Sequence, residues 1–578
     1  MTKNHPNLRK TVSTADLYSD PSPPPIRASL SRNFTTVQRA RPNPFMTSRH
    51  GQQPAPSSRH SIAVPSHSLL DTDNDYFETR PALLKSPTPP PVPPKLKLPP
   101  VQAIPPRAER VRVDPAKYTK PFLDYISTNP TVFHAVDTVA KDLEAHGYTK
   151  LLERDSWKLK KGGKYYVERN GSSLIAFAVG AGYAPGNGAA IIAGHIDALT
   201  AKLKPIPALR TKAGYVQLGV APYAGALNST WWDRDLGIGG RVLVKQGGKI
   251  VSKLVKLDWP IARIPTLAPH FGAASAGPFN KETQMVPIIG LDNSDISGAT
   301  EENWKPALLG GEGAFTSTQP ERLVKAISSE LGIKDYSTIV NWELELFDIQ
   351  PAQLGGLEKE FIFAGRIDDK VCSWAAIQAL LNSTDSDDSS GQIKIVGLFD
   401  DEEIGSQLRQ GARSNFLPTI IERVVDSFAN SGVTSLVSRT YANSFIVSSD
   451  VTHAVNPNFL NVYLENHAPR LNLGLAIAAD SNGHMTTDSV STAILQKCAD
   501  KVGAKLQVFQ IRNDSRSGGT VGPMLSSMTG IRAIDAGIPQ LSMHSIRATI
   551  GSLDPGLGVL AFQGFLDHFE TVDAEFAL

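Results

Sequence analysis

Cysteine is almost missing from this chain of 578 residues, which has only Cys372 and Cys498. Two cysteines provide neither a disulfide framework nor a cysteine-based zinc cluster. Long apolar runs are also missing, because none approaches the ~20 residues that a membrane-spanning helix needs. The first residues lack the apolar stretch of a secretory signal, and Asp16 and Asp20 argue against a mitochondrial presequence. We therefore expect a protein without membrane insertion that is located in the cytoplasm.

A large surplus of either charge is missing too, since the net charge is only +2. That value conceals an asymmetry: residues 1–110 carry 15 Lys and Arg against 7 Asp and Glu, which is +8, so the remainder carries −6. The larger part of the chain is therefore mildly acidic. An acidic surface argues against nucleic acid as the main ligand.

Residues 1–110 form a Pro/Ser-rich tail with little apolar periodicity, and proline peaks between Pro87 and Lys95. Such a composition buries too little surface to offset the entropy of ordering the chain. We expect a disordered tail with polyproline II character. Two interpretations stay open, a plain tail and a ligand for a proline-binding module.

The rest of the chain alternates between predicted strands and predicted helices. The strand candidates are 173–179, 189–193, 393–399, 444–448, 473–478, 506–511 and 531–535. The helix candidates are 118–146 with a break at Asn129-Pro130, 371–381, 487–502, 520–529 and 556–569. Alternation of this kind predicts an α/β fold with a mixed, largely parallel sheet flanked by helices.

Residues 206–350 have a different pattern, with short strand candidates at 240–244, 248–254 and 338–346 and few helical signals. This indicates a β-rich domain inserted between two parts of one α/β domain, residues 111–205 and 351–578. Inside the insert, Gly237-Ile238-Gly239-Gly240 looks like a phosphate-binding loop. It lacks the preceding strand and following helix of such a loop, so we expect a hairpin turn there.

The most informative segment is a run of four acids, Asp400 to Glu403, directly after the apolar run Ile393–Phe399. Four adjacent carboxylates repel one another unless cations stabilise them, which indicates a metal site at the end of a buried strand. An acidic surface turn explains the run equally well when it is taken alone.

Similar chemistry follows other predicted strands. The candidates are His195, Asp197, Asp368, Asp450 and His544. In His195-Ile196-Asp197 the two polar side chains project to the same side of an extended chain, which suits a metal-binding imidazole oriented by a carboxylate. Each candidate also has a structural explanation: a buried histidine bonded to its neighbour, a helix cap, a strand-end turn, or a core histidine.

Taken together, these sites favour a metal centre, because the carboxyl ends of parallel strands meet at one edge of a sheet, where ligands bind. Two histidines and three or more carboxylates suit two zinc-like ions. Two ions can activate a shared water and polarise a carbonyl, while a glutamate outside the ligand set accepts the proton. Glu402 and Glu403 can divide the roles of base and ligand. The chemistry predicted is hydrolysis of an amide, with zinc, manganese or cobalt as the metal.

These segments resemble the aspartyl aminopeptidase and vacuolar aminopeptidase I family of zinc exopeptidases. The resemblance covers roughly residues 115–578 and rests on five motifs in the family's order, at 194–197, 365–368, 399–406, 449–454 and 543–547. Further similar segments lie at 232–236, 512–514 and 519–523.

The resemblance implies two Zn²⁺ ions per subunit, and it implies a role for each candidate residue. The implied metal ligands are His195, Asp368, Glu403, Asp450 and His544, with Asp368 bridging the two ions. Glu402 would be the general base and Asp197 the carboxylate behind His195. His453 would contact the substrate, and His270 would reach the active site of a neighbouring subunit. The family also implies peptide substrates, an α/β catalytic domain, a dimerisation domain at 206–350 and a tetrahedral dodecamer.

Departures from the aspartyl branch bear on the substrate. That branch has a lysine which we align with Ala478, and losing the cation removes a partner for acidic side chains. Segments 221–225 and 367–370 are more similar to the vacuolar branch. We therefore expect a preference for neutral or hydrophobic N-terminal residues, with acidic N-termini as the alternative. The tail does not resemble the short helical propeptide of the vacuolar enzyme, so we expect a cytoplasmic location with the vacuole as the alternative.

Two rival functions remain at this stage. One is a carboxypeptidase or amidohydrolase with a similar metal site, which a carboxylate-binding pocket would favour. The other is a non-catalytic oligomeric scaffold or cargo protein whose tail recruits partners.

Overall fold

The computed structural model describes residues 113–292, 308–384, 390–430, 434–516 and 518–577. The predicted disordered tail and its proline-rich segment lie outside the described residues. No helix in the described part of the chain is long and apolar enough to cross a membrane.

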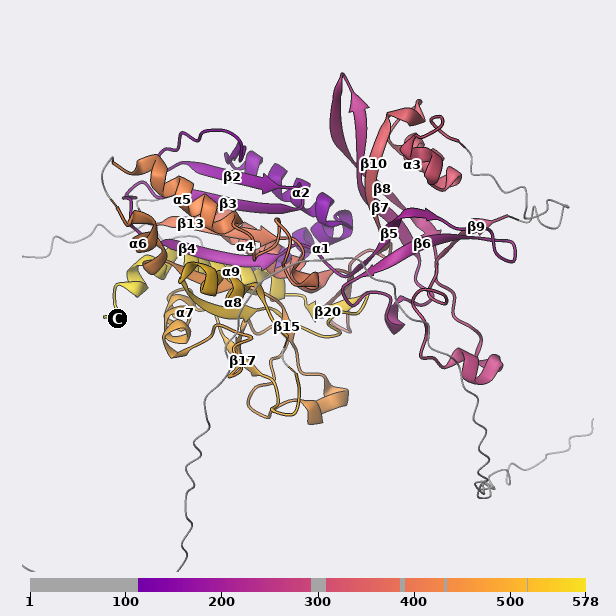
Figure 1. The fold of residues 1–578 in the computed structure, drawn as a ribbon. Coiled ribbons are helices and arrows are strands. Elements are labelled where there is room, and N and C mark those ends of the chain that lie inside the picture. The colour runs from indigo at the N-terminus through magenta and orange to yellow at the C-terminus, as the bar shows by residue number, and fades with distance from the viewer. Residues whose placement is uncertain (1–112, 293–307, 385–389, 431–433, 517, 578) are drawn as a thin grey trace, which may run out of the picture. The chain divides into compact units, whose positions relative to one another are not determined.

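A nine-stranded mixed sheet organises the larger part of the fold, in the order β1-β2-β3-β13-β4-β14-β18-β16-β17 (Figure 1). Its strands are β1 (Thr149–Leu151), β2 (Lys164–Arg169), β3 (Ser173–Val179), β4 (Ala189–His195), β13 (Ile393–Phe399), β14 (Phe445–Ser448), β16 (Ala476–Ala479), β17 (Gln507–Gln510) and β18 (Arg532–Gly537). The central strands β13, β4, β14 and β18 are mutually parallel. Antiparallel pairs join β3 to β13 and β16 to β18. The predicted α/β class with a mixed, largely parallel sheet is confirmed.

Helices cover both faces of this sheet. One face packs against α1 (Thr119–Thr128), α2 (Val132–Ala145), α4 (Ile367–Thr384), α7 (Ser489–Val502) and α9 (Asp554–Asp573). The other packs against α5 (Phe416–Phe428), α6 (Leu436–Ala442) and α8 (Val521–Thr529). Residues of β4 alternate between the two cores, with Ile192 in one and Ile191 in the other, and both are fully buried. Burial on both faces explains why the central strands are continuous apolar runs.

A second sheet has six antiparallel strands in the order β8-β7-β10-β5-β6-β9. These are β5 (Thr200–Ala208), β6 (Tyr215–Tyr223), β7 (Leu236–Gln246), β8 (Lys249–Ala262), β9 (Ile288–Leu291) and β10 (Ile339–Asp348). Its core contains Trp231 and Trp342 and packs against α3 (Glu321–Glu330). The predicted boundaries of the inserted domain, 206 and 350, stay predictions, whereas the sheet itself runs from Thr200 to Asp348.

The hairpin turn expected at 237–240 is wrong, because these residues lie inside β7. Glycine is needed at these positions because the neighbouring strands come too close to leave room for a side chain. A Cβ on Gly240, at φ +148°, would lie 2.0 Å from the backbone oxygen of Glu343, and one on Gly237 would lie 2.5 Å from that of Leu257. The glycines mark a tightly packed strand interior rather than a turn.

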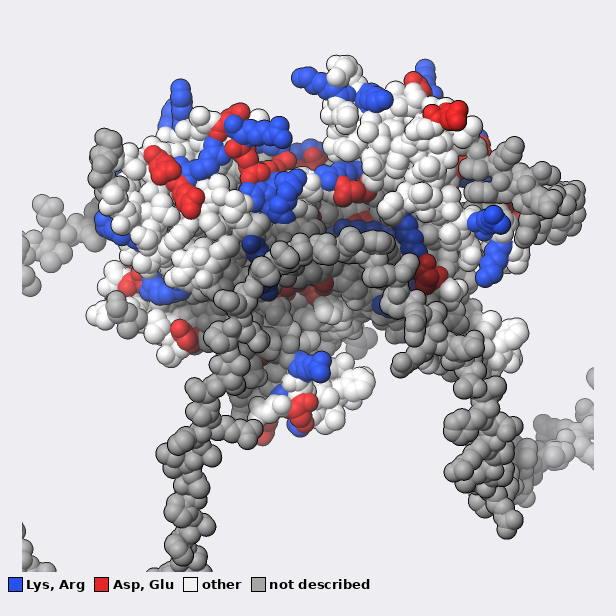
Figure 2. All heavy atoms as spheres, in the orientation of Figure 1, with Lys and Arg blue, Asp and Glu red and all other residues white. Residues whose placement is uncertain are grey.

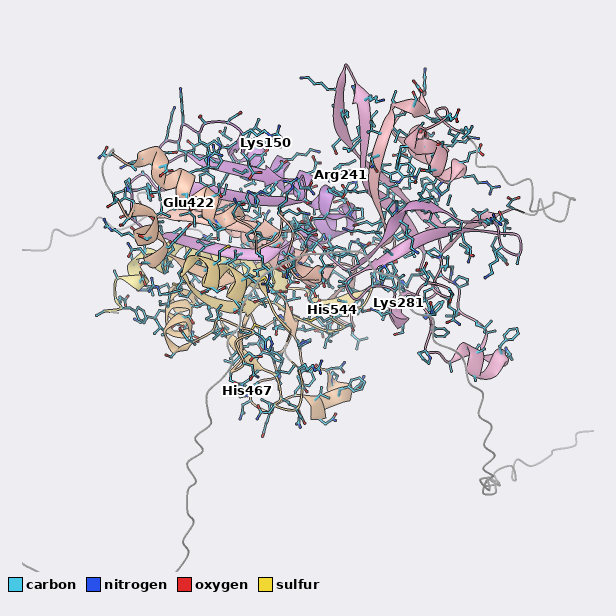
Figure 3. All side chains as sticks on the ribbon, viewed as in Figure 1. Lys150, Arg241, Lys281, Glu422, His467 and His544 are labelled. Carbon is cyan, nitrogen blue, oxygen red and sulfur yellow. The ribbon has the colours of Figure 1, made fainter. Side chains whose placement is uncertain are left out.

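Two small sheets complete the fold. One contains β11 (Gln353–Gly355), β12 (Phe361–Ala364) and β20 (Ala548–Gly551), and the other contains β15 (Thr452–His453) and β19 (Pro539–Gln540). The first contains β11, which follows β10 in the chain, and the segment that carries His544 runs from β19 of the second small sheet to β20 of the first. Figure 3 places His544 in the region between the two large sheets.

Candidate active site

The carboxyl ends of three neighbouring strands supply one side of the site. β4 ends at His195, β13 is followed by Glu402 and Glu403 in η7 (Glu402–Ile404), and β14 is followed by Asp450. These strands are parallel and adjacent, in the order β13-β4-β14, so their ends meet at one edge. This is the arrangement expected from the sequence.

Asp368 and His544 reach the same place from outside the nine-stranded sheet. Asp368 lies in the irregular first turn of α4, just after β12, and His544 lies in the loop between β19 and β20. The expectation that all ligands follow strands of one parallel sheet is therefore wrong for these two. Tertiary packing, rather than sheet order, brings them to the edge.

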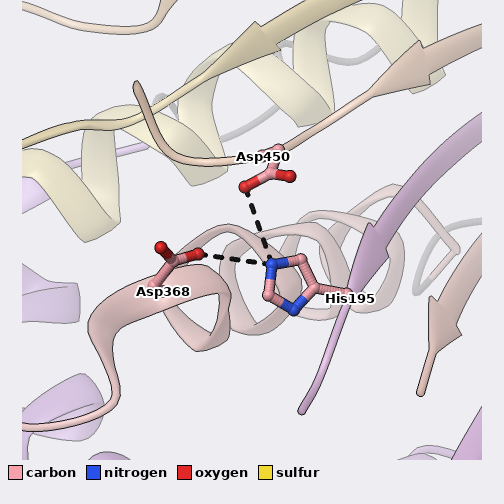
Figure 4. Close-up of side chains that lie close together, drawn as sticks. All are labelled: His195, Asp368 and Asp450. Carbon is pink, nitrogen blue, oxygen red and sulfur yellow. Dashed lines mark ion pairs between the residues drawn. The ribbon is translucent and has the colours of Figure 1, made fainter. Parts of the chain in front are cut away.

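His195, Asp368 and Asp450 lie close enough together to hold a metal ion, and we call them the first ligand group (Figure 4). The His195 Nε2 atom lies 3.3 Å from Asp368 Oδ1 and 3.7 Å from Asp450 Oδ1. The His195 ring comes from the end of β4, and the two carboxylates approach the same ring nitrogen from α4 and from the segment after β14.

Asp368, Glu403 and His544 could hold a metal ion in the same way, and we call them the second ligand group. His544 Nε2 lies 3.8 Å from Asp368 Oδ2 and 3.7 Å from Glu403 Oε2. Asp368 thus belongs to both groups, with Oδ1 toward His195 and Oδ2 toward His544. Gln540 Nε2 also donates to Asp368 Oδ2, at 3.3 Å.

Asp197 holds several parts of the site at once. Its Oδ1 lies 3.2 Å from His195 Nδ1 and accepts a hydrogen bond from the Glu402 backbone N–H at 3.3 Å. Its Oδ2 accepts from the Tyr223 hydroxyl at 2.7 Å and from the Glu403 backbone N–H at 3.3 Å. A proton on Nδ1 of His195, facing this carboxylate, leaves the Nε2 lone pair for a metal ion.

Acidic groups at the site lie in surroundings that disfavour their charge. Burial raises the pKa of Glu402, Glu403 and Asp450, and neighbouring carboxylates raise each of them further. Burial would lower the pKa of His195, but Asp450 and the other carboxylates around it raise the pKa well above its usual value. These carboxyl groups are therefore crowded and poorly solvated, and a cation placed among them would favour their ionised form.

The donor set fits zinc on three observations. Histidine nitrogens and carboxylate oxygens are zinc ligands, and two ligands on one tetrahedral zinc lie about 3.3 Å apart when each bond is about 2.0 Å. The ligand atoms of each group lie within 4.8 Å of one another before any ion draws them together. In addition, Glu403 Oε1 is buried without a hydrogen-bond partner among the described residues, so one ligand oxygen is free for an ion.

A cavity of about 110 Å³ opens onto the ligand groups. Apolar side chains form much of its wall, among them Val451, Met485, Phe509, Ile511 and Met543. His453 also lines it, with its ring 5.5 Å from that of Phe509. No lysine or arginine is among the described residues that line it.

Ala478 is the residue that we align with a lysine of the aspartyl branch. It does not line this cavity. Its position is nevertheless next to the wall, because strand pairing places Ala478 opposite Phe509. His270 lies in η3 (Pro269–Ser275) and is exposed, and the structure does not bring it to the ligand groups of its own chain.

No role was predicted from the sequence for Tyr223, for Gln540 or for the apolar residues that line the cavity. Tyr223 lies at the end of β6 in the second sheet, 26 residues from Asp197 in sequence. Segment 221–225 was compared between the branches of the family, but it gave Tyr223 no role, because only the folded chain brings the two side chains together.

Comparison with known proteins identifies the family. A model of the family Aminopeptidase I zinc metalloprotease (M18) matches residues 125–566. The chain belongs to this family. It is a zinc metallo-aminopeptidase, a hydrolase of peptide bonds, and the resemblance seen in its motifs is confirmed.

Individual relatives agree with this assignment. The M18 chain is 45% identical to vacuolar aminopeptidase 1 of Saccharomyces cerevisiae over 470 residues, 79% of this chain and 89% of that one. It is 40% identical to aspartyl aminopeptidase of Aspergillus oryzae over 475 residues, 78% of this chain and 95% of the relative.

Solved structures agree as well. Chaetomium thermophilum mApe1 is 57% identical with a TM-score of 0.74, covering 80% of this chain and all of that one. The S. cerevisiae mApe1 dodecamer is 39% identical with a TM-score of 0.70, covering 80% of this chain and 99% of that one.

Proposed function

We propose that this M18 aminopeptidase removes N-terminal residues from peptides with two Zn²⁺ ions per subunit. The observation that carries the proposal is the position of Asp368, whose two carboxylate oxygens face the two different histidines of the site, His195 and His544. A carboxylate with one oxygen in each ligand group suits a bridge between two ions. His195 and Asp450 complete one position, and Glu403 and His544 complete the other.

Zinc held by these residues would supply Lewis acidity to polarise the scissile carbonyl and to activate a water molecule. Glu402 is the proposed general base. Its Oε2 lies 3.9 Å from His195 Nε2, next to the first ligand group but outside both groups. Its buried carboxyl, whose pKa is raised, accepts a proton from the attacking water and returns it to the leaving amine. Asp197 orients His195 and fixes the backbone of Glu402 and Glu403.

We propose that neutral or hydrophobic N-terminal residues are preferred. The support is the wall of the cavity, where Met485, Phe509 and Ile511 offer apolar surface to a side chain. An acidic side chain would find no lysine or arginine among the described lining residues, and neither would the C-terminal carboxylate of a carboxypeptidase substrate. Acidic N-termini remain the second candidate, because one relative in the comparison is an aspartyl aminopeptidase.

We propose that residues 111–205 and 351–578 form the catalytic domain, that 206–350 serve dimerisation, and that the chain assembles into a homo-dodecamer. The S. cerevisiae relative whose structure is described as a dodecamer supports this assembly. The exposed position of His270 suits a contact with a neighbouring subunit's active site, and His453 suits a contact with the substrate in its own. Size-exclusion chromatography with light scattering tests this assembly. We expect a particle with twelve times the mass of one chain.

We propose a location in the cytoplasm or the vacuole, the second of which is supported by the name of the S. cerevisiae relative. The tail at 1–110 keeps its two interpretations, a plain extension or a ligand for a proline-binding module. Fluorescence microscopy of the tagged full chain, with and without residues 1–110, separates a targeting role of the tail from a passive one.

The experiment that tests the function is a hydrolysis panel of Leu-, Lys-, Asp- and Glu-anilides with the purified enzyme, with and without a chelator. We expect chelator-sensitive release that is fastest from the Leu substrate. Preference for Asp or Glu would move the enzyme to the aspartyl branch. Failure to hydrolyse any substrate with zinc supplied would instead favour a scaffold or cargo role.

A further inference from the structure

The loop that carries His544 is the least buried part of the metal site. The His544 side chain is 56% exposed, whereas the side chains of His195, Asp368, Glu403 and Asp450 are at most 13% exposed. His544 also has a positive φ of 61°. Side-chain packing therefore does not hold this imidazole in place, and the backbone of its loop must be fixed by other contacts.

Two hydrogen bonds fix that backbone at His544 and two residues after it, and both involve side chains of the segment after β6. Asn228 Nδ2 donates to the His544 carbonyl oxygen at 2.8 Å. The Ile546 N–H donates to Thr230 Oγ1 at 2.9 Å. Ile546 additionally packs its side chain against the core of the second sheet.

The two anchoring side chains form a network with a single consistent arrangement. Asn228 Oδ1 accepts from the Thr230 N–H at 3.0 Å and from Thr230 Oγ1 at 2.6 Å, and its amide group donates to the carbonyls of Gly225 and His544. The one hydroxyl proton of Thr230 therefore points to Asn228, which leaves a lone pair for the Ile546 N–H. Turning the Asn228 amide over would set its NH₂ group against the Thr230 N–H and its oxygen against the two carbonyl oxygens of Gly225 and His544.

An ion pair holds the next residue of the loop. Arg547 Nη1 lies 2.9 Å from Asp348 Oδ2, at the end of β10, and Arg234 Nη2 lies 2.8 Å from the same oxygen. The Asp348 side chain is only 1% exposed, so this charge pair is poorly screened. Arg547 also donates to three backbone carbonyls, those of Gln350, Pro351 and Phe363.

We propose that Asn228, Thr230 and Asp348 are positioning residues that place His544 for the second zinc ion. This inference rests on the proposed two-zinc site. Its consequence is that the two metal positions depend on different parts of the fold. The first is built from the nine-stranded sheet and α4, while the second also needs the segment after β6 and the end of β10.

The decisive variant is Asn228→Asp, measured by zinc content and by competition with a chelator. The substitution keeps an oxygen that accepts from Thr230 and replaces the NH₂ group, so a carboxylate oxygen faces the His544 carbonyl. We expect one of two ions to be lost at a chelator concentration that leaves the wild type loaded. The affinity for that ion should fall about 10- to 100-fold, as is usual when a partner of a metal ligand is removed.

Two further variants, Thr230→Val and Asp348→Asn, test the same inference, and Thr230→Ser is the matched control. Thr230→Val removes the acceptor of the Ile546 N–H at nearly constant volume and should also release one ion, whereas Thr230→Ser keeps the hydroxyl and should retain both. Asp348→Asn removes the charge that holds Arg547 and should weaken the same ion. Circular dichroism and thermal unfolding of each variant show whether the fold is intact.

The outcomes are distinct. The inference is overturned if folded Asn228→Asp and Thr230→Val bind both ions as tightly as the wild type, or if they lose both ions to the same extent. A wild-type enzyme that holds a single ion would instead contradict the proposed two-zinc site itself.

Discussion

At the scale of single residues, the site depends on carboxylates that each serve two neighbours. Asp368 faces both histidines, and Asp197 contacts His195 while accepting the backbone N–H groups of Glu402 and Glu403. Such sharing makes each residue sensitive to substitution, because one change disturbs several distances together. Glu402 lies near the first ligand group without belonging to either group, which suits the proposed division between ligands and base.

Glu402→Gln tests the proposed base. The amide cannot accept the water's proton, so kcat should fall about 10²- to 10⁴-fold. Zinc content should stay unchanged, because the ligand groups keep all their atoms. Leu-anilide hydrolysis and metal analysis check the two expectations, with the exposed Glu422→Gln as a control on α5 (Figure 3). Hydrolysis that survives the Glu402 substitution essentially undiminished would show that another group is the base.

Tyr223→Phe tests the support behind His195. Loss of the 2.7 Å hydrogen bond to Asp197 should lower zinc affinity or kcat about 10-fold. The aromatic ring stays, and with it the contact with Lys202, whose Nζ lies 4.0 Å from the ring centre. Tyr215→Phe in the same strand, at an exposed position, is the matched control. Equal zinc affinity and equal kcat for Tyr223→Phe and wild type would remove Tyr223 from the site.

At the scale of elements, the sequence predicted the central strands and the long helices well. Strands buried on both faces are apolar throughout, as at Ile393–Phe399, and such runs are visible without a structure. The glycines of β7 misled the prediction, because close contact between strands and a tight turn both require glycine. α5 and α6 were not predicted at all, although both pack firmly against the sheet.

Asp488→Ala tests the start of α7. Asp488 accepts from the Ser491 N–H at 2.7 Å and Ser491 Oγ accepts from the Asp488 N–H at 2.9 Å, which together form a capping box. Removing the cap should lower the free energy of unfolding by about 1 kcal/mol. Urea denaturation measures the change, and Gln496→Ala at an exposed position of the same helix should alter it far less. Equal stabilities for the two variants would mean that packing against the core, not the cap, determines where α7 begins.

At the scale of the whole molecule, the placement of charged side chains predicts that metal binding stabilises the fold. The described surface seen in Figure 2 intersperses basic and acidic side chains, whereas the site concentrates carboxylates in a buried place. Cations that bind the folded site stabilise the folded state by mass action. Without them the carboxylates repel one another at short range.

Removal of zinc should therefore lower both activity and stability. A chelator should abolish Leu-anilide hydrolysis and lower the melting temperature, and added zinc should restore both. Differential scanning fluorimetry at several zinc concentrations measures the shift. Glu402→Gln should show the same shift without activity, which separates metal binding from catalysis. A melting temperature that is unchanged after complete metal removal would contradict a zinc-stabilised fold.

The sequence by itself determined the α/β class, the family and the residues with metal-ligand chemistry, because buried strands and ligand side chains have local signatures. The side chains after β4, β13 and β14 could be grouped in advance, since parallel neighbouring strands end at one edge. Only the tertiary structure decided that Asp368 and His544 come from outside that sheet, that Tyr223 lies behind Asp197, and that Asn228 and Thr230 hold the His544 loop. These contacts join residues 26 to 316 positions apart, and no local pattern encodes a contact at such a distance.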